Sequence, residues 1–123
     1  MRHAQATTYD GIPYDQLPIE DVEWTDKAAE HVRNRSGRKD RPNEFDVEPD
    51  WATEAALDPR RLVRDSGSRS GQTVGVVGRS LTCGRVLEVV LLPQRHPPHG
   101  HWWGVTAWVA SRANRAEYED ETR

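Results

Sequence analysis

A strand-to-helix stretch over residues 102–118 constrains the fold of this chain more than any other segment. Successive residues of a strand point to opposite faces, and neither face of 102–110 carries a charge. One face would hold Trp103, Val105, Ala107 and Val109, and the other Trp102, Thr106, Trp108 and Ala110. We therefore expect a central strand that is covered on both sides. Ser111 is a suitable N-cap for a helix over 112–121, so the chain turns from sheet to helix at this point.

Helix and strand patterns follow a simple order along the rest of the chain. A weak strand over 19–24 precedes a helix that Thr25 or Asp26 would cap and Gly37 would end. A second short helix runs from Pro49 to about residue 58. Strands are then predicted over 61–65, 72–79 and 86–92, with a hairpin link over 80–85 and a longer loop over 93–101. This order predicts an α+β domain: a small antiparallel sheet of three to four strands, two N-terminal helices and one C-terminal helix.

The apolar residues of the last two strands predict where the core lies. In the middle strand, alternation puts Leu87, Val89 and Leu91 on one face and Glu88 on the other. We expect one buried cluster there, whose members are Leu87, Leu91, Val105 and Val109.

Length and composition predict a single domain with a modest core. The chain has 123 residues, of which 35% are hydrophobic. Residues 1–18 are polar, and we expect them to be a disordered or loosely docked extension that folding does not need; 19–123 would form the domain. No apolar run of about 18 residues and no signal-peptide core is seen, and Cys83 is the single cysteine. We expect a cytoplasmic protein that does not enter a membrane.

The net charge of −3 hides an uneven distribution. Residues 61–116 hold eight arginines and two acidic residues, a net charge of +6, whereas residues 1–60 carry −6. A basic middle segment can meet a polyanion even in a protein that is acidic overall. Neutralisation of the two parts within the fold is the alternative.

Several local motifs occur in an informative order over about residues 20–120. An acidic-Trp segment and an alanine-rich helix lead to a basic stretch: Val22-Glu23-Trp24-Thr25-Asp26-Lys27-Ala28-Ala29, then Asn34-Arg35-Ser36-Gly37. Further along come Asp58-Pro59-Arg60, Val77-Gly78-Arg79, Val89-Val90-Leu91, Ala110-Ser111-Arg112-Ala113 and Arg115-Ala116-Glu117-Tyr118-Glu119. In this order and spacing the chain resembles the BrnT family of bacterial toxins, whose fold is similar to that of the RelE ribonuclease toxins.

The resemblance implies a ribonuclease toxin of a type II toxin–antitoxin system, which cleaves mRNA without a metal and is held by a small antitoxin of the ribbon-helix-helix kind. The chain departs from the family at two places. Arg35-Ser36-Gly37 stands where the family usually has Lys-His-Gly, and Leu92-Pro93-Gln94-Arg95 stands where it often has Tyr-Thr-Glu-Arg. These departures favour the alternative of a diverged, catalytically inactive binding subunit that acts through a protein partner.

Ribonuclease chemistry gives the candidate catalytic residues. Cleavage without a metal needs a base for the ribose 2′-OH, a cation for the phosphorane and an acid for the leaving oxygen. Arginines bind phosphates well. The candidates for both catalysis and RNA binding are Arg79, Arg95 and Arg112, which we expect to cluster at one end of the sheet. Arg115 is a further candidate for RNA binding. Glu88 and Tyr118 are the catalytic acid–base candidates. The alternative is that these arginines are ordinary strand-end residues, solvated or paired with carboxylates.

Two other sets of residues leave their role open. His96, His99 and His101 lie among prolines, and they are either solvated loop residues, acid–base groups or metal ligands. No metal or other cofactor is predicted. Trp102, Trp103 and Trp108 can stack RNA bases, but strand tryptophans beside valines more often belong to the core.

Overall fold

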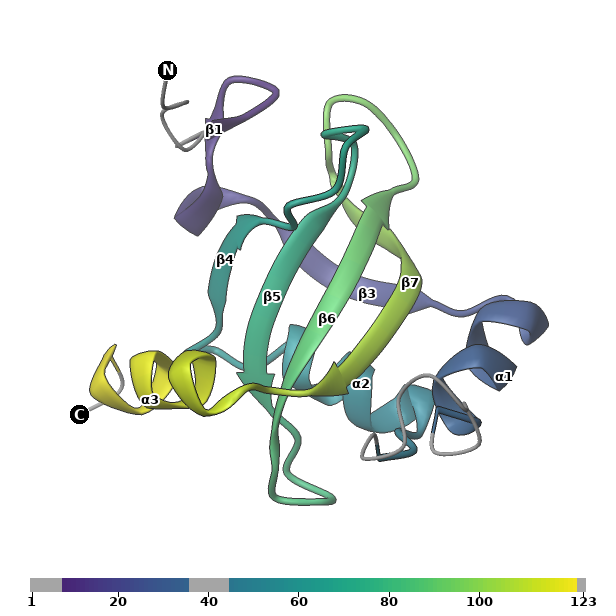
Figure 1. Cartoon of the computed structure of the whole chain (residues 1–123). Coiled ribbons are helices and arrows are strands. Elements are labelled where there is room, and N and C mark those ends of the chain that lie inside the picture. Colours follow the sequence, from purple (N-terminus) through teal and green to yellow (C-terminus); the bar gives the residue numbers. More distant parts are fainter. Residues whose placement is uncertain (1–7, 36–44, 122–123) are drawn as a thin grey trace.

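The computed structural model describes residues 8–35 and 45–121 of the chain. A five-stranded sheet runs through it in the order β3-β7-β6-β5-β4 (Figure 1). Its strands are β3 (Ile19–Glu23), β4 (Leu62–Asp65), β5 (Val74–Arg79), β6 (Val86–Pro93) and β7 (Gly100–Val109). The helices are α1 (Asp26–Arg33), α2 (Pro49–Ala56) and α3 (Arg112–Glu121). A two-stranded ribbon, β1 (Thr8–Tyr9) and β2 (Ile12–Pro13), and the 3-10 turn η1 (Tyr14–Gln16) precede β3.

The predicted α+β class is confirmed, but the predicted sheet is wrong in two respects. The sheet has five strands rather than three or four, and it is mixed rather than antiparallel, because β3 pairs with β7 in parallel. The β4–β5, β5–β6 and β6–β7 pairs are antiparallel, as neighbouring strands joined by short links usually are. No helix within the described residues is long and apolar enough to cross a membrane.

The helix boundaries follow from local chemistry. The Thr25 hydroxyl accepts a hydrogen bond from the Ala28 backbone at 3.1 Å, which caps α1. Pro49 begins α2, where its missing N–H costs nothing. Ser111 caps α3 by accepting from the Asn114 backbone at 3.2 Å. The predicted end of the first helix at Gly37 lies outside the described residues.

One face of the sheet, called here the helix-pair face, is covered by α1 and α2 (Figure 1). The main core lies between these two helices and the sheet. Leu87, Val89 and Leu91 of β6 point into this core with no exposed surface, as predicted. The close approach of α2 depends on Gly78, because a Cβ there would lie 2.0 Å from the Ala55 carbonyl oxygen. This contact explains why β5 has glycine near its end.

A β-bulge in β7 changes which residues point inward. Val90 pairs with Thr106 and Leu91 pairs with Gly104, so Val105 has no partner. Trp102 and Gly104 therefore face the helix-pair side before the bulge, whereas Ala107 faces it after the bulge. The prediction that Val105 belongs to the buried cluster is wrong, because Val105 is 39% exposed. Strict alternation had placed all odd-numbered residues of β7 on one face.

Residues 8–18 pack more closely than the expected loose extension. Leu17 is 2% exposed and Tyr9 is 7% exposed, and both belong to the main core. The Tyr9 hydroxyl donates to the Gln72 carbonyl at 2.7 Å, and the Trp102 indole N–H donates to the Pro18 carbonyl at 2.8 Å. The apolar residues of this segment gave no periodic signal in the sequence, yet they anchor it on the core. Residues 1–7 lie outside the described part of the chain.

The opposite side of the sheet, called here the α3 face, is only partly covered. Tyr118 of α3 packs on Val77 and Val86 in a second, smaller cluster. Figure 1 shows α3 across one end of the sheet, on the side away from α1 and α2. The remainder of this face carries the polar residues from which the candidate site is built.

Candidate functional site

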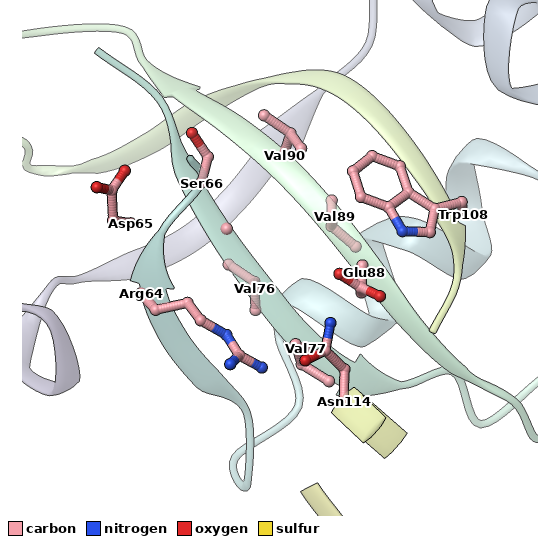
Figure 2. Close-up of a pocket in the computed structure, with 11 residues that line it drawn as sticks. Arg64, Asp65, Ser66, Val76, Val77, Glu88, Val89, Val90, Trp108 and Asn114 are labelled. Atoms are coloured by element: carbon pink, nitrogen blue, oxygen red, sulfur yellow. The ribbon is translucent and has the colours of Figure 1, made fainter. Parts of the chain in front are cut away.

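A hollow of about 190 Å³ lies on the α3 face, between β4, β5, β6 and the start of α3 (Figure 2). Register explains how it forms, because Glu88 lies opposite Val77 on β5 and opposite Trp108 on β7. Arg64 lies opposite Gly75, which has no side chain to fill the space between β4 and β6. The polar and aromatic residues that line the hollow are Arg64, Asp65, Ser66, Glu88, Trp108 and Asn114.

Arg64 supplies a cation to this hollow. Its Nη1 donates to Glu117 Oε2 on α3 at 3.1 Å, which fixes the guanidinium in place. Its Nη2 is buried and makes no hydrogen bond to any of the described residues. A buried N–H group without a partner is costly. The Arg64 guanidinium is always charged, and a phosphate oxygen in the hollow would lie next to this side chain.

Glu88 supplies a carboxylate to the same hollow. Its Oε2 accepts a hydrogen bond from the Ser111 backbone at 3.1 Å, at the N-terminus of α3. This contact holds the side chain in one orientation, and a carboxylate at a helix N-terminus is favourable. Figure 2 shows the Glu88 carboxylate and the Asn114 side chain projecting over the same part of the sheet. Glu88 is thus the one predicted acid–base residue that the structure places in the hollow.

Trp108 forms the edge of the hollow on the β7 side. The guanidinium of Arg35 lies 5.5 Å from the centre of its ring, and Arg35 Nη1 donates to the Thr106 hydroxyl at 3.0 Å. Arg35 is 3% exposed, so a second cation is held close to the indole. The hollow therefore has one arginine, Arg64, two carboxylates, Asp65 and Glu88, and an aromatic ring, and Arg35 lies behind that ring.

Two of the predicted catalytic residues, Arg79 and Tyr118, occur together at a different place. They line a cavity of about 360 Å³ with Asp58, and the Arg79 guanidinium lies 5.8 Å from the centre of the Tyr118 ring. The Tyr118 hydroxyl donates a hydrogen bond to Asp58, whose carboxylate also accepts from the Arg79 and Arg60 backbones at 2.9 Å each. These contacts join the turn after α2, β5 and α3.

The titration behaviour of this second cluster indicates a structural role. Burial raises the pKa of Tyr118, and its hydrogen bond to Asp58 raises that pKa further. Burial also acts to raise the pKa of Asp58, but hydrogen bonds from Tyr118, Arg79 and Arg60 outweigh it, so the pKa of Asp58 is lowered. A buried phenol that already donates to a carboxylate is poorly suited to protonate a leaving oxygen in the hollow.

The predicted cluster of three arginines does not form. Arg79 and Arg112 lie at one end of the sheet, because Arg79 pairs with Val86 and Leu87 pairs with Val109. Arg95 follows the other end of β6, and antiparallel pairing places it at the opposite sheet end. Arg112 and Arg115 are exposed on the first turns of α3, next in sequence to residues that contact or line the hollow.

The loop histidines also lie away from the hollow, beyond the far end of β6 from Glu88. His96 Nδ1 lies 3.4 Å from Asp10, and His101 Nδ1 lies 2.6 Å from Asp21. The first pair links the loop to the N-terminal ribbon, and the second links β7, in which His101 lies rather than in the predicted loop, to β3. Within residues 8–35 and 45–121, no group of three or more His, Cys, Asp or Glu is arranged to hold a metal ion.

Sequence reasoning missed five polar residues at or beside the hollow: Arg35, Arg64, Asp65, Ser66 and Asn114. Arg64 lies in a short strand that was predicted, and its alternation with Asp65 could have assigned it to a sheet face. No local pattern points to Arg35, because its contact with Trp108 joins residues 73 positions apart. No protein-family model matches the chain, and no curated protein matches it either, so the arrangement of these residues is what bears on function.

Proposed function

We propose that the chain is a ribonuclease toxin of the BrnT kind, which cleaves mRNA without a metal ion in the hollow on the α3 face. One observation carries this proposal. A carboxylate, Glu88, and a permanently charged guanidinium, Arg64, line the same hollow in the basic part of the chain. The motif order that resembles the BrnT family supports the same reaction class.

The proposed chemistry divides the work between these two residues. Glu88 acts as the general base and takes the proton of a ribose 2′-OH. The 2′-oxygen attacks the adjacent phosphorus, and Arg64 stabilises the charge that develops on the phosphoryl oxygens. The bond to the 5′-oxygen breaks, water protonates that oxygen, and a 2′,3′-cyclic phosphate remains on the upstream fragment.

The net charge of the segment from which the hollow is built supports an RNA substrate. Residues 61–116, which include β4 to β7 and the start of α3, carry the net charge of +6. Arg112 and Arg115 are exposed beside the hollow and free to contact flanking phosphates. They keep the RNA-binding role predicted for them, whereas Arg79 and Arg95 have no part in the hollow.

The test is cleavage of a single-stranded RNA by the full chain in the presence of EDTA. We expect fragments that end in a 2′,3′-cyclic phosphate, and a rate that falls about 10²- to 10⁴-fold in Glu88→Gln. Glu30→Gln is the matched control, because Glu30 is exposed on α1. Cleavage at an equal rate by Glu88→Gln and Glu30→Gln would refute the assignment of the base.

A catalytically inactive binding subunit on the same fold is the second candidate. The observation that favours it is the hydrogen bond from Ser111 to Glu88, which gives this carboxylate a structural role in capping α3. The hollow also has no histidine among its lining residues. On this reading the chain binds a protein partner, for which a small ribbon-helix-helix antitoxin is the candidate. RNA binding or partner binding without cleavage or growth arrest would support it.

A further inference from the structure

We propose that Trp108 is the platform on which one base of a single-stranded RNA stacks, beside the phosphate held at Arg64. This inference rests on the proposed function and specifies its substrate: an unpaired strand with one base inserted against the indole. Trp108 lines the hollow and is only partly buried. Its partner across the β6–β7 ladder is Glu88. A nucleobase on Trp108 and a phosphate at Arg64 would therefore lie on either side of Glu88, the proposed general base.

The contacts of Trp108 suit a stacking platform. Arg35 lies over the ring and is itself hydrogen-bonded to Thr106, so a guanidinium holds the indole in place. Trp108 lines the hollow, whereas Arg35 does not. A nucleobase has two apolar faces and stacks well on an aromatic ring next to an arginine.

The other tryptophans of this region have different roles. Trp102 is fully buried, and Gly104 is covered by the indole of Trp24, whose N–H donates to Thr53 at 3.0 Å. Trp103 is 37% exposed on β7, but its neighbour across the parallel ladder is Glu23, in a strand that also carries Glu20 and Asp21. Those carboxylates repel a phosphate backbone. Trp103 is therefore an exposed tryptophan on the same strand to which RNA should not bind. It serves as the matched control for Trp108.

An unpaired strand is required because a base within a duplex is already stacked on both faces. Stacking on one aromatic side chain gives little sequence preference, since every base has such a face. The removal of one platform typically weakens binding about 5- to 100-fold. Duplex RNA of the same sequence should therefore bind more weakly than the single strand.

The experiment measures binding of a fluorescein-labelled 12-nucleotide RNA by anisotropy, with Glu88→Gln as the parent so that the RNA stays intact. We expect Trp108→Leu to weaken binding about 5- to 100-fold, Trp108→Phe to retain most of it, and Trp103→Leu to leave it within about 2-fold of the parent. Urea unfolding of each variant checks that its fold is intact. As a second readout, RNA should quench the tryptophan emission of the parent and of Trp103→Phe, but much less that of Trp108→Phe.

The outcomes separate this inference from the proposed function. If the parent binds single-stranded RNA and Trp108→Leu binds it as well as Trp103→Leu does, the stacking platform is refuted while the RNA site stands. If RNA quenches Trp108→Phe as strongly as the parent, the platform is refuted even where the leucine variant fails to fold. If neither the wild-type chain nor the parent binds RNA, the proposed function fails, and this inference fails with it.

Discussion

Replacement of Gly78 by alanine should destabilise the protein, because α2 lies directly on this residue. A Cβ at position 78 would lie 2.0 Å from the carbonyl oxygen of Ala55 and 2.8 Å from its carbonyl carbon. Ordinary contacts of a Cβ begin near 3.4 Å, so the helix must recede by more than 1 Å. Both atoms belong to the helix backbone, which cannot move aside as a flexible side chain would. The movement would loosen Ala52 and Ala56, neither of which has exposed surface.

The expected cost is about 3 kcal/mol, at the upper end of the range for overpacking in a tight core. Alanine lowers the conformational entropy of the unfolded chain, which stabilises the folded protein by about 0.4–1 kcal/mol. The net loss in the free energy of unfolding is therefore roughly 2 kcal/mol. For a domain of this size the midpoint of thermal unfolding should fall by about 6–12 °C. Urea titration followed by tryptophan fluorescence and by circular dichroism measures the loss directly.

Gly75→Ala is the control for this experiment. Gly75 lies on the same strand, but a Cβ there would meet its nearest atom at 3.4 Å, an ordinary contact. Its free energy of unfolding should stay within about 1 kcal/mol of the wild-type value. Equal stability of Gly78→Ala and Gly75→Ala would show that α2 is not seated on β5 as described.

Two further predictions concern buried contacts. Leu17→Ala should lower the free energy of unfolding by about 2–5 kcal/mol, because Leu17 is 2% exposed. Leu81→Ala should change it by less than about 0.5 kcal/mol, because Leu81 is 87% exposed. Equal effects of the two substitutions in urea unfolding would mean that residues 8–18 are loosely docked. Asp58→Asn should lower stability at pH 7 by about 1.5–3 kcal/mol, because it removes the charge from three hydrogen bonds. The pKa of Asp58 is lowered by folding, so its contribution is present above the unfolded value of about 3.9 and is lost as the pH falls through the folded value. Wild-type protein should therefore lose more stability than Asp58→Asn between pH 7 and pH 3, and parallel losses would contradict the role given to this carboxylate.

Local patterns predicted the elements well, because their causes are local. Thr25, Pro49 and Ser111 mark helix starts through hydrogen bonds or backbone geometry within a few residues. The alternation of β6 placed Leu87 inward and Glu88 outward, and both assignments are confirmed. These features depend on neighbours along the chain, which the sequence displays directly.

Features that depend on distant residues were not predictable in this way. The parallel pairing of β3 with β7 joins segments separated by about 80 residues, and nothing in the pattern of 19–24 identifies its partner. The bulge at Val105 breaks the alternation on which the face assignment of β7 relied. The site was affected in the same manner. Glu88 was predicted as an acid–base group near the candidate arginines, while Arg64 reaches the hollow and Arg35 reaches Trp108 only through tertiary contacts.

The sparse attachment of α3 has a consequence for the motions of the molecule. Among the described side chains of this helix only Tyr118 is buried, and polar contacts at Asp58, Arg64, Arg79 and Glu88 also hold the helix. Elements with few buried contacts open at a lower free energy than the body of the protein. The last helix therefore forms a separate opening unit, and its detachment would remove Asn114 from the hollow and uncover Val77 and Val86 in the same event. Amide hydrogens of α3 should exchange with solvent long before those of β6, so that one wall of the hollow has a shorter lifetime than its floor.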